Sequence, residues 1–279
     1  MKRQSKSTYR SAILGGICAA GFVLSGPSFA WDDPVTYLPN SSDVQFKYNN
    51  LETVVSQVGD SLTGIFAISS IGDPSGTPTY WASGLSGSEL NGVFHDLVIS
   101  QITPTVGGYN IYFTGGSLEM YNVANGSYNP SGPADSIDQQ ICGAAACPDA
   151  WLTFDFVPGI VTVDDPATVG FDETTTTLLS TVTALTEPLT GTGDGNLLVT
   201  GGTAAWFFNP EMSLQSNLQD CTNPGPNFAA NCNSAGDWPL ASFDPVVGST
   251  ADVPEPNMIV LMGAGLLGFG LVGRLRKKA

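Results

Sequence analysis

The chain has 279 residues, with nine Lys or Arg against 25 Asp or Glu, and a formal net charge of −16. Between Trp31 and Glu255, Lys47 is the one basic residue, so one cation against 25 acids gives this part a charge of −24. Nucleic acid is therefore excluded as a natural partner, because binding it requires Lys and Arg to neutralise phosphates. Anionic lipid headgroups are disfavoured for the same reason. Divalent cations or a cationic surface suit such a chain, and so do salty or acidic surroundings.

The first 30 residues have the pattern of a secretory signal peptide. Basic residues within the first ten positions precede an apolar or small stretch over 11–24, and Ser28-Phe29-Ala30 places small residues where signal peptidase cleaves. Cys18 would suggest a lipoprotein, but Ile17 stands where a small residue is needed. We expect cleavage after Ala30, which puts the mature chain outside the inner membrane.

Residues 31–242 are predicted to form one all-β domain. Apolar and polar residues alternate over 152–156 and over 44–48, the period-two pattern of a strand with one buried face. Runs rich in β-branched or aromatic residues, bounded by Gly, Pro, Asp or Asn, predict further strands at 62–69, 92–100, 109–114 and 178–186. Since turn residues recur at short intervals, we expect an antiparallel β-sandwich that is jelly-roll-like.

Loops are expected at four places: 73–78, 125–148, 188–196 and 218–239. Inside the third, Gly191-Thr192-Gly193-Asp194-Gly195 lacks the G-x-G-x-x-G spacing of a dinucleotide site, so it predicts a turn. Residues 243–252 are expected to be a short stalk between the domain and the end of the chain.

Four cysteines remain in the mature part. An even number in an exported chain favours disulfides. We expect the local pairs Cys142–Cys147 and Cys221–Cys232, because each pair sits in one loop rich in Gly, Pro, Asn and Asp. Metal binding is the alternative, but the C-x4-C and C-x10-C spacings are not those of zinc ribbons.

No catalytic constellation stands out. A Ser-His-Asp site would have to use His95, the single histidine, which lies in a strand-like run, and no G-x-S-x-G motif occurs. Paired carboxylates can hydrolyse glycosides, and Glu119 and Asp155 are strand acids that could face a groove, although solvated strand faces are the default. We therefore expect neither enzyme activity nor a cofactor.

Calcium is the ion that the acidic loops favour, because it prefers oxygen ligands. No D-x-D-x-D-G loop is present. The candidates for a structural calcium site are Asp164, Asp165, Asp172 and Glu173.

Aromatic side chains can stack on sugars, and the mature chain offers Trp81, Trp151, Trp206 and Trp238 for a carbohydrate platform. Because large aromatic residues dominate burial, we expect most of them in the core and one exposed.

The last 27 residues combine a proline motif, an uncharged run and a basic tail. Val253-Pro254-Glu255-Pro256 is followed by Met258–Gly273 without a charge and then by four basic residues. The run is slightly shorter than the roughly 20 residues that span a bilayer, but flanking basic side chains can snorkel. Positive charge keeps that end cytoplasmic. The prolines hold an extended segment outside the membrane, which suits a protease substrate or an ordinary anchor with a proline-rich stalk.

This arrangement resembles the PEP-CTERM sorting signal of Gram-negative bacteria. The resemblance covers about a tenth of the chain and implies processing by an exosortase-like membrane peptidase. It also implies an association with exopolysaccharide production, biofilm and floc formation. A sortase signal would need L-P-x-T-G, which is absent. The residues that carry the resemblance are Val253, Pro254, Glu255, Pro256, Arg274, Arg276, Lys277 and Lys278.

We thus expect a signal peptide (1–30), a β-sandwich domain (31–242), a stalk (243–252) and a sorting signal with a transmembrane helix (253–279). The protein is expected first at the inner membrane, with its domain in the periplasm, and then at the cell surface or in the extracellular matrix. The first hypothesis is a non-catalytic structural or interaction role in biofilm or floc formation. A carbohydrate-binding module for exopolysaccharide and a secreted hydrolase are the alternatives. Two carboxylates about 5–10 Å apart in a cleft would favour the hydrolase.

Overall fold

The computed structural model describes residues 32–131, 137–143, 146–186, 188–221, 232 and 238–252. The expected signal peptide, transmembrane helix and sorting motif lie outside these residues. Across the described part of the chain, no helix is long and apolar enough to cross a membrane. The strands are β1 (Asp43–Glu52), β2 (Ser61–Gly72), β3 (Thr79–Ala82), β4 (Ser88–Thr105), β5 (Gly108–Ala124), β6 (Leu152–Val157), β7 (Leu178–Val182), β8 (Thr190–Gly201), β9 (Glu211–Asp220) and β10 (Leu240–Ser249). The helices are α1 (Ile137–Cys142) and the 3-10 turns η1 (Pro34–Tyr37), η2 (Leu85–Gly87), η4 (Glu173–Thr175) and η5 (Ala205–Phe207).

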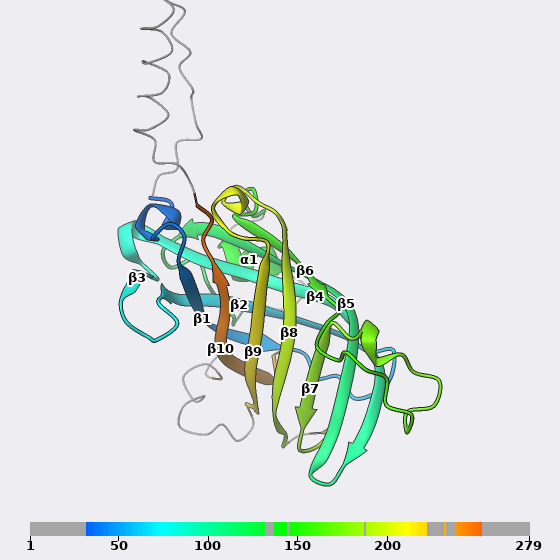
Figure 1. Ribbon diagram of the computed structural model, residues 1–279. Coiled ribbons are helices and arrows are strands. Elements are labelled where there is room, and N and C mark those ends of the chain that lie inside the picture. Colours follow the sequence, from blue (N-terminus) through cyan, green and yellow to red (C-terminus); the bar gives the residue numbers. More distant parts are fainter. Residues whose placement is uncertain are drawn as a thin grey trace, which may run out of the picture. The chain divides into compact units, whose positions relative to one another are not determined.

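These strands form an eight-stranded antiparallel barrel (Figure 1). Around the barrel the strand positions follow the order β1, β2, β4, β5, β6 with β7, β8, β9 and β10, while β3 is an additional strand that pairs with β2. β1 pairs with both β2 and β10, which closes the sheet. The prediction of an all-β antiparallel domain is confirmed. The strands do not divide into the two facing sheets of the expected jelly-roll sandwich, because β1 joins what would have been the two open edges.

The short strands β6 and β7 together occupy one strand position in the barrel wall, between β5 and β8. β5 pairs with β7 over residues 109–113 and with β6 over residues 117–120. β8 likewise pairs with β7 over 191–195 and then with β6 over 196–201. The change of partner falls at Gly115 and Gly116, whose positive φ angles of 71° and 99° allow β5 to bend there.

The wall places apolar side chains inside because strand residues alternate between the two faces of a sheet. On β1, residues 44, 46, 48, 50 and 52 are buried, while residues 43 and 47 are exposed. β8 follows the same alternation, with Gly191, Gly193 and Gly195 on the inward side and Leu197 continuing their row. The turn expected at Gly191–Gly195 and the loop expected at 188–196 are therefore wrong, since β8 begins at Thr190.

The expected stalk is also part of the barrel. β10 runs from Leu240 to Ser249 and pairs with β1 along its whole length. The backbone N–H of Thr250 then donates to Ser42, and the backbone N–H of Ala251 donates to Phe207. The barrel domain thus extends through position 251 rather than ending at 242.

One end of the barrel is filled by aromatic side chains, and we call it the filled end. Phe208 packs against Phe46, Trp151 and Phe207, with ring centroids 5.6–5.7 Å apart. The indole N–H of Trp151 donates to Asp33 at 2.8 Å, which holds the start of the domain over this end. At the opposite or far end, the connections between strands include residues 53–60, 106–107, 183–186 and 188–189 (Figure 1).

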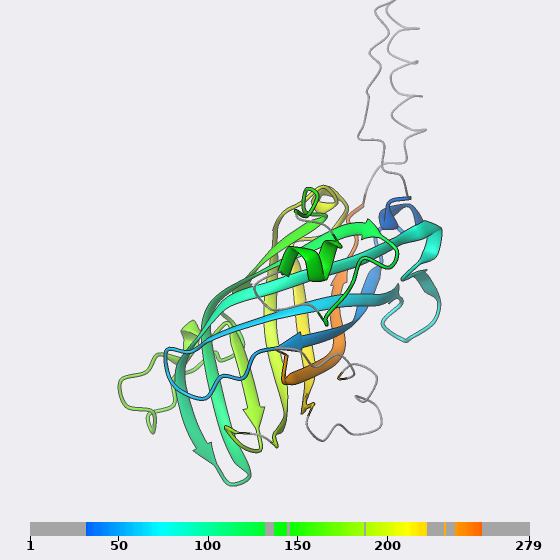
Figure 2. The same ribbon diagram turned by 180° about the vertical axis from the view of Figure 1, so that it is seen from behind.

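A second, smaller cluster covers part of the barrel's outer surface. Figure 2 shows α1 lying across the outside of the wall. Ile141 of α1 packs with Trp238 and with outward residues of β1, β2 and β4. Disulfides join Cys142 to Cys147 and Cys221 to Cys232, the local connectivity favoured above, and these cysteines belong to the same cluster.

Candidate functional site

The barrel interior contains an elongated apolar cavity of about 80 Å³. Its wall receives side chains from every strand of the barrel. It runs from Phe46 and Met120, beside the filled end, to Val55 and Leu189 in the connections at the far end. A cavity of roughly 150 Å³ lined by apolar side chains admits one benzene ring. The present cavity is smaller in volume, and its lining spans the barrel from one end to the other, which favours a slender molecule over a ring system.

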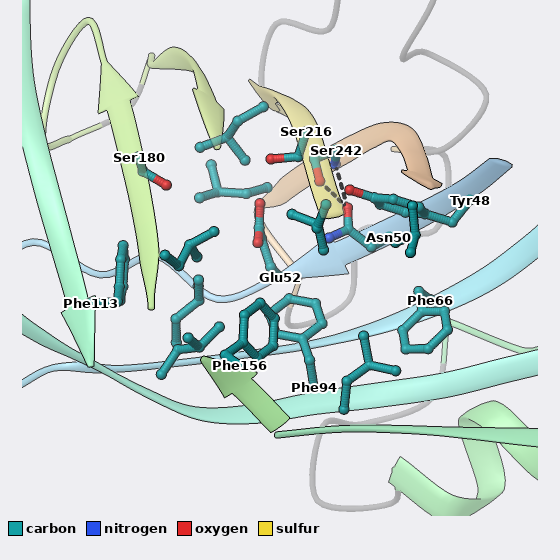
Figure 3. Close-up of a pocket in the computed structure, with 18 of the residues that line it drawn as sticks. Tyr48, Asn50, Glu52, Phe66, Phe94, Phe113, Phe156, Ser180, Ser216 and Ser242 are labelled. Carbon is teal, nitrogen blue, oxygen red and sulfur yellow. Dashed lines mark hydrogen bonds between the residues drawn. The ribbon is translucent and has the colours of Figure 1, made fainter. Parts of the chain in front are cut away.

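Five polar residues interrupt the apolar lining of the cavity. They are Asn50, Glu52, Ser180, Ser216 and Ser242, and all of them are labelled in Figure 3. The side-chain oxygen of Asn50 accepts hydrogen bonds from the backbone N–H of Ser242, at 2.8 Å, and from its hydroxyl group. Ser180, Gly193 and Ser216 lie in one row across β7, β8 and β9. A Cβ at Gly193 would lie 2.6 Å from the hydroxyl oxygen of Ser216, so the glycine makes room for this polar row.

Glu52 is the ionisable group of the cavity wall. It ends β1, is 7% exposed, and is in register with Leu240 of β10 and Gly64 of β2. Figure 3 shows its carboxyl group pointing into the cavity, between Ser216 and Ser242 on one side and Phe94 and Phe156 on the other. Within the described part of the chain, no group pairs with this carboxyl. Burial raises the pKa of Glu52 from its ordinary 4.5 to about 8.

His95, the candidate for a Ser-His-Asp site, lies on the outside of the barrel. Its Nδ1 is 2.8 Å from a carboxylate oxygen of Asp96, and the hydroxyl oxygen of Ser117 is 3.5 Å from Nδ1 and 3.4 Å from Nε2. Because this oxygen is almost equally far from both nitrogens, it is not in line with the lone pair of either one. The three residues are also solvent-accessible, with Asp96 79% exposed. They do not form the aligned relay that a triad needs.

The strand acids and the calcium candidates do not reach the cavity. Glu119 and Asp155 alternate with the inward residues Leu118 and Phe154, so they lie on the outer face. Glu119 accepts a hydrogen bond from the hydroxyl of Tyr121.

The acidic loop at 164–173 uses its carboxylates to hold its own backbone. Asp164 accepts from the backbone N–H of Glu173 at 3.0 Å, and Glu173 accepts from that of Asp165. Asp172 accepts from Thr174 at 3.0 Å, and hydrogen bonds from Thr174 lower the pKa of Asp172. Among the residues that the structure describes, no three or more His, Cys, Asp or Glu side chains are placed to hold a metal ion.

The four tryptophans divide as expected between core and surface. Trp81, Trp151 and Trp238 are buried, and Trp206 is 61% exposed. The Trp206 ring packs edge-on against the buried Phe207, at 5.5 Å between centroids and 79° between planes. These tryptophans therefore do not form a multi-ring sugar platform.

The cavity was missed by sequence reasoning, although β1 carries a signal for it. Asn50 and Glu52 continue the alternation that begins with Phe46 and Tyr48, so both fall on the inward face of one strand. An acid on the buried face of a strand requires an explanation, because an unpaired charge is costly to bury.

The C-terminal end of the chain matches a known family. A family model for the PEP-CTERM protein-sorting motif matches residues 252–277. The chain is a PEP-CTERM sorting domain-containing protein. Comparison with curated proteins and with solved structures found no match.

In this PEP-CTERM protein, the motif implies export, a membrane-anchored sorting signal and processing by exosortase, a membrane enzyme. The matched residues begin at Asp252, directly after Ala251, whose backbone bonds to Phe207 at the filled end. The sorting motif thus continues from the filled end of the barrel, opposite the connections at the far end.

Proposed function

We propose that this PEP-CTERM protein is a non-catalytic binding protein of the cell surface or extracellular matrix, and that its barrel interior holds a slender apolar ligand. The observation that carries the proposal is the elongated cavity, which is apolar apart from a few inward polar groups. Ligand sites are commonly concave and mostly apolar, with a small number of polar groups that orient the ligand.

The sorting signal supports a location in the matrix. PEP-CTERM proteins are associated with exopolysaccharide, biofilm and floc formation, so the proposed role is in that setting.

Binding inside the barrel is tested with octanol, a neutral slender probe, by isothermal titration calorimetry on the exported protein. Ser216→Leu places a larger side chain in the cavity, whereas Ser213→Leu makes the same change at an exposed position of the same strand. We expect one octanol per barrel, at least tenfold weaker binding in Ser216→Leu, and unchanged binding in Ser213→Leu. Equal binding by both variants contradicts an interior site.

The sorting role has its own test. Replacement of Pro254-Glu255-Pro256 by alanines is expected to leave the protein membrane-bound and unprocessed, as fractionation and immunoblotting would show. Normal release of this variant refutes exosortase processing through the motif.

A further inference from the structure

The cavity wall carries a carboxyl group without a cation to balance it. Apart from Glu52, the residues that the structure places in the wall are apolar or neutral, and Tyr48 is the other titratable one. The hydroxyl of Tyr48 donates to the carbonyl of Gln215 at 2.9 Å. Lys47, the one basic residue between Trp31 and Glu255, is on β1 but on its exposed outer face.

A second acid lies near Glu52 at the far end. Asp220 ends β9, is 2% exposed, and continues the inward row of Ser216 and Leu218. Asp220 and Glu52 are both in register with Leu240 of β10, from its two sides. The two strands that flank β10 therefore each carry an acidic residue at this end of the barrel.

We propose that the barrel binds a slender aliphatic amine, with its ammonium group paired to Glu52 and its hydrocarbon chain inside the cavity. The inference rests on the proposed function and adds the chemical class of the ligand to it. An unpaired carboxylate at 7% exposure is costly in an apolar interior, and a cationic partner offsets part of that cost.

The same charges argue against a fatty acid as the ligand. A carboxylate in this cavity would find no described cation in the wall and would face the acid of Glu52. The part of the chain from Trp31 to Glu255, with a formal charge of −24, also repels anions and attracts cations. The cavity is thus selective for positive or neutral head groups.

Polar and aromatic residues share the same rows of the wall. Asn50 is in register with Ser242 and with Phe66. Glu52 is in register with Gly64, whose other neighbour in register is Phe94. The amino group therefore lies at Glu52, and the aliphatic chain extends along the apolar lining.

Pairing with Glu52 is linked to a proton. Below about pH 8 the buried carboxyl holds its proton, so an incoming ammonium ion releases that proton to solvent and leaves a carboxylate–ammonium pair. Above that pH the carboxylate is already formed, while an alkylammonium stays charged up to about pH 10. Amine affinity should therefore rise about tenfold per pH unit from pH 6 to 7.5 and then level off.

The test compares octylamine, octanoate and octanol on the exported protein by isothermal titration calorimetry. The wild-type protein is compared with two variants. Glu52→Gln keeps the shape of the side chain but removes its charge, and Glu211→Gln makes the same change at an exposed position of β9. At pH 8 we expect octylamine to bind at least tenfold more tightly than octanoate. Glu52→Gln should weaken octylamine at least tenfold and change octanol less than about twofold, and Glu211→Gln should change neither. Repeating the octylamine titration at pH 6.5 in two buffers should show release of about one proton.

Three results separate the possible failures. If octanol binds but octanoate binds as tightly as octylamine, the amine class is wrong and the interior site stands. If octylamine binds equally to wild type and Glu52→Gln, the carboxyl is not the partner. If none of the three probes binds, the proposed function itself fails.

Discussion

Glu52 holds its carboxyl group inside the barrel, and the consequence is a stability that depends on pH. Its folded-state pKa of about 8 is above its ordinary value of 4.5. Between these values the native state keeps a proton that the unfolded state releases. The contribution of Glu52 is therefore fully present below about pH 4.5, and it is lost as pH rises through about 8.

Urea unfolding at about pH 5 and pH 8.5 tests this residue directly. Relative to Glu52→Gln, the wild-type protein should lose about 4 kcal/mol of unfolding free energy between the two conditions. Glu211→Gln removes an exposed acid and should follow the wild type. If wild type and Glu52→Gln respond to pH alike, the carboxyl of Glu52 is not buried.

Residue patterns alone predicted some of these local features and missed others. The split of the tryptophans followed from the general burial of large aromatic residues. Local pairing of the cysteines followed from the position of each pair in one loop and agrees with the two disulfides. The environment of Glu52 did not follow, because it depends on Leu240 and Ser242, which are about 190 residues away in the chain.

On the scale of elements, two reciprocal pairs of Gly and Phe hold β2 and β4 in register. Phe66 of β2 is in register with Gly92 of β4, and Phe94 of β4 is in register with Gly64 of β2. A Cβ at Gly92 would lie 2.3 Å from the ring of Phe66 and 2.2 Å from the carbonyl oxygen of Glu119. The ring therefore covers a strand glycine, an arrangement that compensates for the missing side chain.

Gly92→Ala should destabilise the barrel by about 1–3 kcal/mol, because the added methyl group overlaps the ring and a fixed backbone oxygen. Gly107→Ala is the matched control, since nothing lies within 4 Å of a Cβ at that position. Thermal or urea unfolding measures both. Equal stability of the two variants would show that β2 and β4 do not pack as described.

The strands that were predicted are those with large side chains on the inward face. The patterns at 44–48 and 152–156 correspond to β1 and β6. The first part of β8 was missed because its inward positions 191, 193 and 195 are glycines, which erase the period-two pattern. β10 was missed because Pro245 lowers the expectation of a strand. Residues 244–245 of β10 have no partner in β9. The N–H group that Pro245 lacks is therefore not needed for the pairing of these two strands.

On the scale of the whole molecule, the difference between sandwich and barrel lies in one long-range pairing. Asp43 and Ser249 face each other across the closure of β1 on β10. Alternation of apolar and polar residues is the same in both architectures. The all-β class was therefore predictable, whereas the closure, and with it the cavity, was not.

Lys47 allows limited proteolysis to report on this closure. The residue lies within β1, where its neighbours in register are Pro245 of β10 and Ser70 of β2. Trypsin should leave the native domain intact, because the cleavage site is held in a strand paired on both sides. After unfolding and reduction it should cut residues 31–252 once, after Lys47. Rapid cleavage of the native protein would contradict a closed barrel.

The central claim is that the interior of the barrel, rather than its outer surface, takes the ligand. Crystals of the exported protein soaked with bromooctane test it most directly, because anomalous scattering locates the bromine atom. Our account predicts a bromine peak inside the barrel, close to the cavity residues Phe66, Phe94 and Phe156. Bromine peaks on the outer surface with none inside the barrel would contradict it.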